Sequence, residues 1–151
     1  MTNFNKYIET EWTNPDGTTT NIYLHKKFDL ATIGASVYIG DDVYIGKFAH
    51  IGYGAGIGDG VTVGNYARIR NWVAVGCGAN ISNRTFVGEN AFVGKYASIG
   101  KGAVIGERAS VLENAIVGKY ASIGERSTVH ENAIVDRYAY ITAGTYYSTG
   151  G

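Results

Sequence analysis

An aliphatic residue stands at every sixth position from Ile33 to Ile141, without one exception. A small or β-branched residue precedes each of them by two positions, and a glycine usually follows at once. A helix would give a period of 3.6 and an alternating strand a period of two, so neither explains this pattern. A fixed period of six predicts short, similar units that stack on one another.

The segment Ala97-Ser98-Ile99-Gly100-Lys101-Gly102 shows the unit. Its small and aliphatic residues are two apart, so both point to one side of an extended segment while the residue between them points outwards. The glycine and the two residues after it must then turn the chain, and we expect glycine here because it tolerates the positive φ of a corner. Three strands and three corners close a triangular coil of 18 residues.

Several four-residue motifs repeat along this stretch. They are Val-Tyr-Ile-Gly at 37–40 and 43–46, Ala-Phe-Val-Gly at 91–94, and Ala-Ser-Ile-Gly at 97–100 and 121–124. In these motifs the chain resembles the bacterial hexapeptide-repeat superfamily. The resemblance implies an all-β fold, a left-handed parallel β-helix of about six triangular coils, with the left hand taken from the family. It also implies an acyltransferase-like protein that assembles as a homotrimer with parallel axes.

Residues 1–30 lack the repeat. Two β-rich segments, 7–13 and 18–25, flank Asn14-Pro15-Asp16-Gly17, a strong turn signal that predicts a β-hairpin. The open end of a solenoid needs cover against edge-to-edge pairing, so we expect this hairpin to be a cap; a partner-binding or swapped arm is the alternative. The expected organisation is a cap over 1–30, the β-helix over 31–146 and a C-terminal tail over 147–151.

The chain carries 13 basic and 13 acidic residues. This neutrality argues against a binding surface for a nucleic acid polymer. A single cysteine, Cys77, cannot form an internal disulfide, which fits a reducing compartment. No apolar run follows Met1, so we expect neither a signal peptide nor contact with a membrane, and the expected location is cytoplasmic.

The 18-residue period places the outward residues of successive coils in columns. One column reads Thr32, His50, Arg68, Phe86, Val104, Ser122 and Tyr140. The columns contain many apolar residues, and contiguous exposed apolar surface usually marks an interface, which favours the homotrimer.

The repeat departs from itself near the basic part of this column, where Arg70 and then Ser82 replace the corner glycine. Strands of neighbouring coils are about 4.8 Å apart, so arginines and a histidine from these coils are expected to surround one anion. The planar fork of arginine suits phosphate, and an aromatic plane suits a base or another flat ring. The candidate ligand-binding residues are His50, Arg68, Arg70, Trp72, Arg84 and Phe86.

Three functions fit these residues. We favour a protein that binds or sequesters a small phosphorylated molecule, a nucleotide or a coenzyme-A-like ligand, in a basic cleft between subunits, without a cofactor. The alternative is an acyltransferase with acyl-CoA as donor and His50 as general base, although the family's aliphatic-Ala-His-Asp motif is missing. The third is a structural assembly module whose arginines pair with carboxylates across the interface.

A metal site is not expected. The zinc enzymes of this superfamily need three histidines on neighbouring strands. The chain has only His25, His50 and His130, which are far apart in the repeat.

Overall fold

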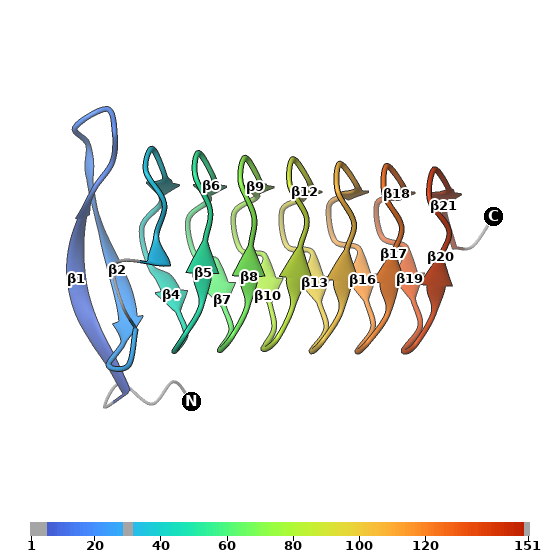
Figure 1. Cartoon of the computed structure of the whole chain (residues 1–151), viewed down its shortest axis with the longest axis horizontal. Helices are drawn as coiled ribbons and strands as arrows, with labels where there is room; N and C mark the ends of the chain where they lie inside the picture. The colour runs from blue at the N-terminus through green and yellow to red at the C-terminus, as the bar shows by residue number, and fades with distance from the viewer. Residues whose placement is uncertain (1–5, 29–31, 150–151) are drawn as a thin grey trace.

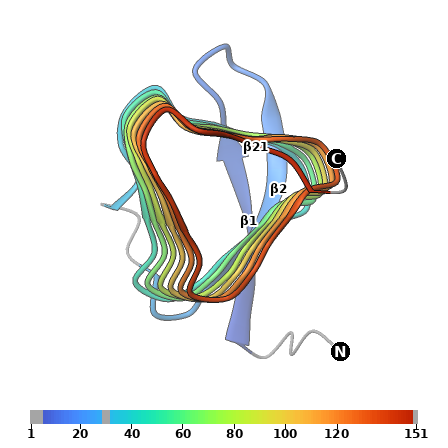
Figure 2. The same cartoon turned by 90° about the vertical axis from the view of Figure 1, so that its right-hand side faces the viewer.

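The computed structural model describes residues 6–28 and 32–149. A β-hairpin lies at one end, and a column of stacked coils with a triangular cross-section follows it (Figures 1 and 2). The coils contain 19 strands, β3 to β21, arranged in three parallel sheets. The predicted all-β, parallel β-helix fold is thus confirmed. No helix among the described residues is long and apolar enough to cross a membrane.

The three sheets are the three sides of the column, and we name them A, B and C. Sheet A contains β1 (Tyr7–Thr13), β2 (Thr19–His25), β4 (Val43–Ile45), β7 (Thr62–Val63), β10 (Asn80–Ile81), β13 (Ser98–Ile99), β16 (Ile116–Val117) and β19 (Ile134–Val135). Sheet B contains β5 (His50–Ile51), β8 (Arg68–Ile69), β11 (Phe86–Val87), β14 (Val104–Ile105), β17 (Ser122–Ile123) and β20 (Tyr140–Ile141). Sheet C contains β3 (Tyr38–Ile39), β6 (Gly56–Ile57), β9 (Ala74–Val75), β12 (Phe92–Val93), β15 (Ser110–Val111), β18 (Thr128–Val129) and β21 (Tyr146–Tyr147).

The interior of the column holds the periodic aliphatic residues. Each stacks on the residue 18 positions further on, as Ile69 does on Val87. All members of the series are buried except Ile33 in the first coil, which is half-buried. Burying one such side chain is worth about 1.5–3 kcal/mol, so this interior supplies the main stabilisation of the fold.

The N-terminal hairpin is bonded to the first coil. Strand β2 pairs in parallel with β4, which extends sheet A by two strands. The Asn14 side chain accepts a hydrogen bond from the backbone N–H of Ile39 (2.8 Å), and the Thr20 hydroxyl donates to its carbonyl (2.8 Å). The hairpin therefore covers the open end of sheet A and is tied to sheet C, as a cap should be. The expected boundary at residue 30, and Ala31 with it, lies outside the described residues.

The role expected for the glycine after each aliphatic residue, tolerance of positive φ, is wrong. Positive φ occurs three residues after the aliphatic residue. Bulky residues such as Trp72 (φ 62°) and Tyr96 (φ 59°) adopt it there. The glycine directly after the aliphatic residue is needed for a different reason. A Cβ on Gly100 would lie 2.7 Å from the backbone nitrogen of Lys119 in the next coil. Close approach of successive coils, rather than φ, favours glycine at this position, although Arg70 and Ser82 show that the fold accommodates a side chain in some coils.

At the C-terminal end, side chains of the last described residues bond to the last strand of sheet A. The Tyr147 hydroxyl donates to the carbonyl of Ile134 (3.0 Å), and the Thr149 hydroxyl accepts from the N–H of Ile134 (3.1 Å). Both backbone groups of this edge residue are therefore satisfied. Tyr147 belongs to β21, and residues 150–151 of the expected tail lie outside the described part.

Candidate functional site

Three of the predicted ligand-binding residues form one column on sheet B. His50 begins β5, Arg68 begins β8 and Phe86 begins β11, and the register pairs His50 with Arg68 and Arg68 with Phe86. The side chains of His50 and Arg68 are exposed, and Phe86 is half-buried. The column deduced from the 18-residue period is confirmed.

A hollow of about 150 Å³ opens beside the base of this column. It is lined by His50, Gly52, Ile69, Arg70 and Asn71. A Cβ on Gly52 would lie 2.6 Å from the backbone carbon of Arg70, so glycine is what lets these two coils approach so closely. The hollow brings together an imidazole that can accept a proton and a guanidinium that can hold an anion.

Asn71 was not among the predicted site residues, and its side chain is fixed by the backbone below it. Its Oδ1 accepts a hydrogen bond from the N–H of Tyr53 at 2.9 Å. The same kind of bond recurs at corners of the other two edges, where the Oδ1 atoms of Asn65, Asn83 and Asp59 accept from the N–H groups of Lys47, Asn65 and Asp41. The sequence signal for these side-chain to backbone hydrogen bonds was asparagine or aspartate at corner positions 18 residues apart.

A second hollow, of about 270 Å³, lies on the other side of Arg70. Its lining consists of Arg70, Phe86, Gly88, Glu89 and Glu107. The guanidinium carbon of Arg70 lies 6.0 Å from the centroid of the Phe86 ring, within the range of a cation–π contact. Arg70 thus borders both hollows, which makes it the central residue of this face.

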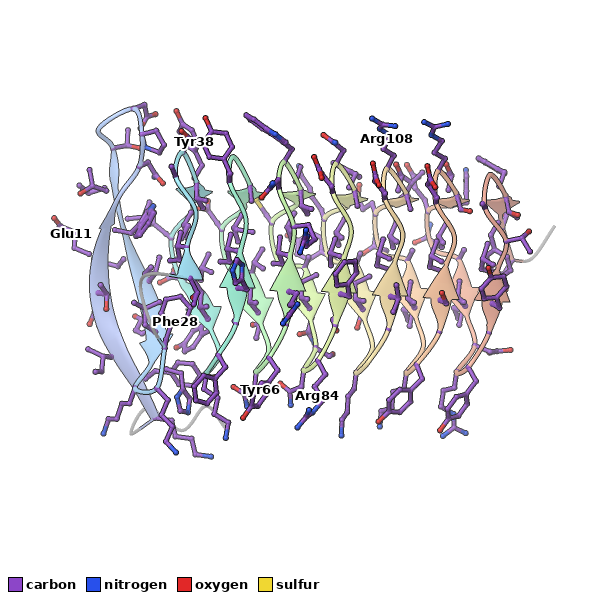
Figure 3. All side chains as sticks on the ribbon, viewed as in Figure 1. Glu11, Phe28, Tyr38, Tyr66, Arg84 and Arg108 are labelled. Atoms are coloured by element: carbon purple, nitrogen blue, oxygen red, sulfur yellow. The ribbon has the colours of Figure 1, made fainter. Side chains whose placement is uncertain are left out.

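Arg84 and Trp72 line neither hollow. The guanidinium carbon of Arg84 lies 4.8 Å from the centroid of the Tyr66 ring, and both side chains project from the same edge of the column (Figure 3). Trp72 packs edge-to-face on Tyr53, with 5.0 Å between ring centroids, and its ring lies against Gly54. One subunit therefore does not gather all six predicted residues around one point, and their role in ligand binding stays a prediction.

The arginines of this face carry no carboxylate partner within the part of the chain that the structure describes. There, the only ion pair joins Arg126 and Glu125, at 3.7 Å on the surface. Arg68 and Arg70 are both exposed, so their charges remain available to an anionic ligand or to a second subunit. The described residues also contain no group of three His, Cys, Asp or Glu side chains placed to hold a metal ion.

The sequence and the fold both match known proteins. The family described as bacterial transferase hexapeptide (six repeats) matches residues 36–71 and 84–119. In these repeats the chain matches the hexapeptide-repeat transferase family. Both matched stretches lie in the β-helix, and they include His50, Arg68 and Arg70 of the first hollow's face together with Phe86 above it. None of the proteins of curated function matches the sequence.

Solved structures share the hexapeptide-repeat fold at low sequence identity. A putative acetyltransferase from Bacillus cereus is similar with a TM-score of 0.72 and 19% identity, covering 80% of this chain and 72% of that one. The acetyltransferase domain of PglB from Neisseria gonorrhoeae has a TM-score of 0.70 and 22% identity, covering 76% and 54%. PerB from Caulobacter crescentus, solved with CoA and GDP-perosamine, has a TM-score of 0.65 and 21% identity, covering 72% and 51%. The chain therefore spans about half the length of the last two proteins.

Proposed function

We propose that this hexapeptide-repeat protein is an acyltransferase that moves an acyl group from an acyl-CoA donor to an amine or hydroxyl acceptor. The observation that carries the proposal is the shared hollow of His50 and Arg70 on a fold whose family consists of transferases. Two similar structures were solved with CoA or acetyl coenzyme A bound, which supports the same donor here. This replaces simple sequestration, which the residues alone had favoured, as the leading function.

In the proposed reaction His50 is the general base. It accepts the proton of the acceptor's amine or hydroxyl group as that group attacks the thioester carbonyl. The carbon–sulfur bond then breaks, the acyl group stays on the acceptor, and the departing thiolate takes the proton from His50. Arg68 and Arg70 would hold phosphates of the donor or the acceptor, since guanidinium groups bind phosphate through paired hydrogen bonds.

The size of the hollows supports a site completed by a second subunit. Sites for drug-sized ligands usually measure about 300–1,000 Å³, and the hollow beside His50 has only about 150 Å³. Exposed apolar side chains on the flat faces, such as Val104 on sheet B and Ile116 and Ile134 on sheet A, offer surface for subunit packing. The proposed assembly is a homotrimer with the substrates in the clefts between subunits.

Acyl transfer is tested by following release of free CoA thiol from acetyl-CoA with a panel of amino sugars and nucleotide-linked amino sugars. We expect turnover with at least one acceptor and a loss of at least a hundredfold in His50→Ala, whereas His130→Ala, a histidine at the edge between sheets C and A, keeps full activity. Arg70→Ala should raise the KM with a smaller effect on kcat. Equal turnover in wild type and His50→Ala would refute the proposed base.

The binding protein remains the second candidate, because the family's aliphatic-Ala-His-Asp motif is missing from the chain. Native mass spectrometry with nucleotides and acyl-CoAs separates the two functions. A trimer that retains about one phosphorylated ligand per subunit, without turnover of any acceptor, would favour binding. A bare trimer across the whole panel would instead favour the structural module.

A further inference from the structure

Positive charge gathers on one edge of the triangular column, where sheet A turns into sheet B. Each coil passes this edge through two corner residues, beginning with positions 47 and 48 and recurring every 18 residues. The cations at these positions are Lys47, Arg84, Lys101, Lys119 and Arg137, and the aromatic residues are Phe48, Tyr66, Tyr120 and Tyr138. Among the described residues, the only acidic one in these corner turns is Asp136. We call this line the basic edge.

The basic edge continues onto the cap. Strand β2 pairs with β4 so that Leu24 lies opposite Ile45, and residues 25–27 therefore follow the same edge as residues 46–48. Lys26 donates its N–H to the carbonyl of Lys6 at 2.8 Å. With Lys6, Lys26 and Lys27 added to the five corner cations, eight of the 13 lysines and arginines lie here.

The other two edges carry most of the acidic residues. On the edge between sheets B and C, Glu89, Glu107 and Glu125 are balanced by Arg70, Arg108 and Arg126. The edge between sheets C and A carries Asp41, Asp42, Asp59, Glu113 and Glu131 against one lysine, Lys95. A neutral chain thus becomes a column with one positive, one balanced and one mainly acidic edge. Net charge alone, on which we based the argument against a nucleic acid polymer, does not describe such a surface, because an anion is attracted by the local field.

The aromatic side chains of the basic edge stack on one another. The rings of Phe48 and Tyr66 are 5.3 Å apart, and those of Tyr120 and Tyr138 are 5.5 Å apart with nearly parallel planes. Arg84 lies over the Tyr66 ring as well. Proteins that bind single-stranded nucleic acid offer open ring faces to the bases, and stacking already takes up one face of each ring in these two pairs. The outward surface consists of ring edges, tyrosine hydroxyls and cations.

We propose that the basic edge binds a linear acidic polysaccharide along the column. Four successive coils each present a cation, Arg84, Lys101, Lys119 and Arg137, at a spacing of about 4.8 Å. That spacing is close to the length of one sugar residue in an extended chain. From Lys47 to Arg137 the edge covers five coils, about 24 Å, so it is long enough for several residues of such a chain. The tyrosine hydroxyls provide hydrogen-bond partners for the sugar hydroxyls.

The test measures binding of a fluorescently labelled oligogalacturonate of about ten residues by anisotropy at low salt. We expect saturable binding that weakens steadily with added salt, because ion pairs are screened. The double variant Lys101→Ala with Lys119→Ala should bind at least tenfold more weakly. The matched control is Arg108→Ala with Arg126→Ala, which removes two exposed cations from the edge between sheets B and C and should change affinity less than twofold. Circular dichroism and thermal unfolding show that each variant is folded.

Three outcomes would overturn the proposal. The first is no binding of the oligogalacturonate by the wild-type protein at low salt. The second is an equal loss in both double variants, which would indicate diffuse attraction instead of binding at the basic edge. The third is tighter binding of a single-stranded DNA of the same charge, which would identify a nucleic acid as the partner. None of these measurements depends on acyl transfer, so a failure here leaves the proposed enzyme untouched.

Discussion

The Asn71 side chain accepts a hydrogen bond from the backbone N–H of Tyr53, one coil below it, at 2.9 Å. This bond fixes a residue that lines the hollow of His50 to the wall of the column. Asn71→Ala leaves the Tyr53 N–H without this acceptor, and we expect a loss of about 1 kcal/mol in the free energy of unfolding. Asn71→Asp keeps an acceptor at the same place and should lose less. Urea denaturation of the three proteins checks the order.

A glycine after the aliphatic residue is expected to stabilise the fold where the backbone of the next coil lies against it. Gly52→Ala would place a Cβ 2.6 Å from the backbone of Arg70 and should destabilise the protein by more than about 2 kcal/mol while deforming the hollow. Gly56→Ala is the matched control, since nothing lies within 4 Å of its Cβ. There we expect a neutral result or a gain below about 1 kcal/mol. Similar losses in both variants would contradict close approach as the reason for glycine.

The corners contain strain that one substitution can relieve. Arg108 is exposed and has a φ of 59°, a conformation that costs about 1–2 kcal/mol for most side chains and less for asparagine. Asparagine already occupies the equivalent corner positions at Asn90, Asn114 and Asn132. Arg108→Asn should therefore raise the free energy of unfolding by about 0.5–1 kcal/mol, and Arg108→Ala, which keeps the strain, should not. Chemical denaturation at fixed pH distinguishes the two variants.

Acid should weaken the cap through His25. Burial, and then the charges of Lys47, Lys6 and Lys27, hold the pKa of this imidazole below its usual value. The unfolded chain therefore binds the proton at a higher pH than the folded one, and the stability that a neutral His25 contributes is present above the unfolded pKa of about 6.5. It is lost as the pH falls through that value towards the folded pKa.

Thermal unfolding of wild type and His25→Gln between pH 8 and pH 5 tests this prediction. We expect the wild-type midpoint to fall more steeply below about pH 6.5 than the midpoint of the variant. Parallel pH profiles would show that another group is responsible for any acid sensitivity.

Periodicity was sufficient to predict the coils, the buried residues and the outward columns. A repeat of 18 residues per coil determines which residues stack, so the pairing of His50 with Arg68 and of Arg68 with Phe86 followed from counting. Turn chemistry likewise predicted the hairpin around Asn14 to Gly17, which the structure confirms.

The directions in which the corner side chains point could not be predicted from the sequence. Arg84 lies over Tyr66, and Trp72 lies against Gly54, because each corner turns through a residue of positive φ that counting cannot orient. Asn71 was overlooked for a related reason. From the sequence, a polar residue at a corner is expected to be solvated. Only the structure shows that the coil below supplies a hydrogen-bond donor to it. The ligand-binding role of the six predicted residues, the trimer and the cytoplasmic location stay predictions.

The uniform register of the coils makes the length of this protein adjustable in whole steps. Each coil contacts only the coils on either side of it, so removal of one complete period joins two corners of the same kind. Deleting residues 109–126, for example, would shorten the β-helix by one coil and leave every residue from His50 to Phe86 with its present neighbours. Whole coils can therefore be added to or removed from the C-terminal part of the β-helix without changing the contacts of the candidate site.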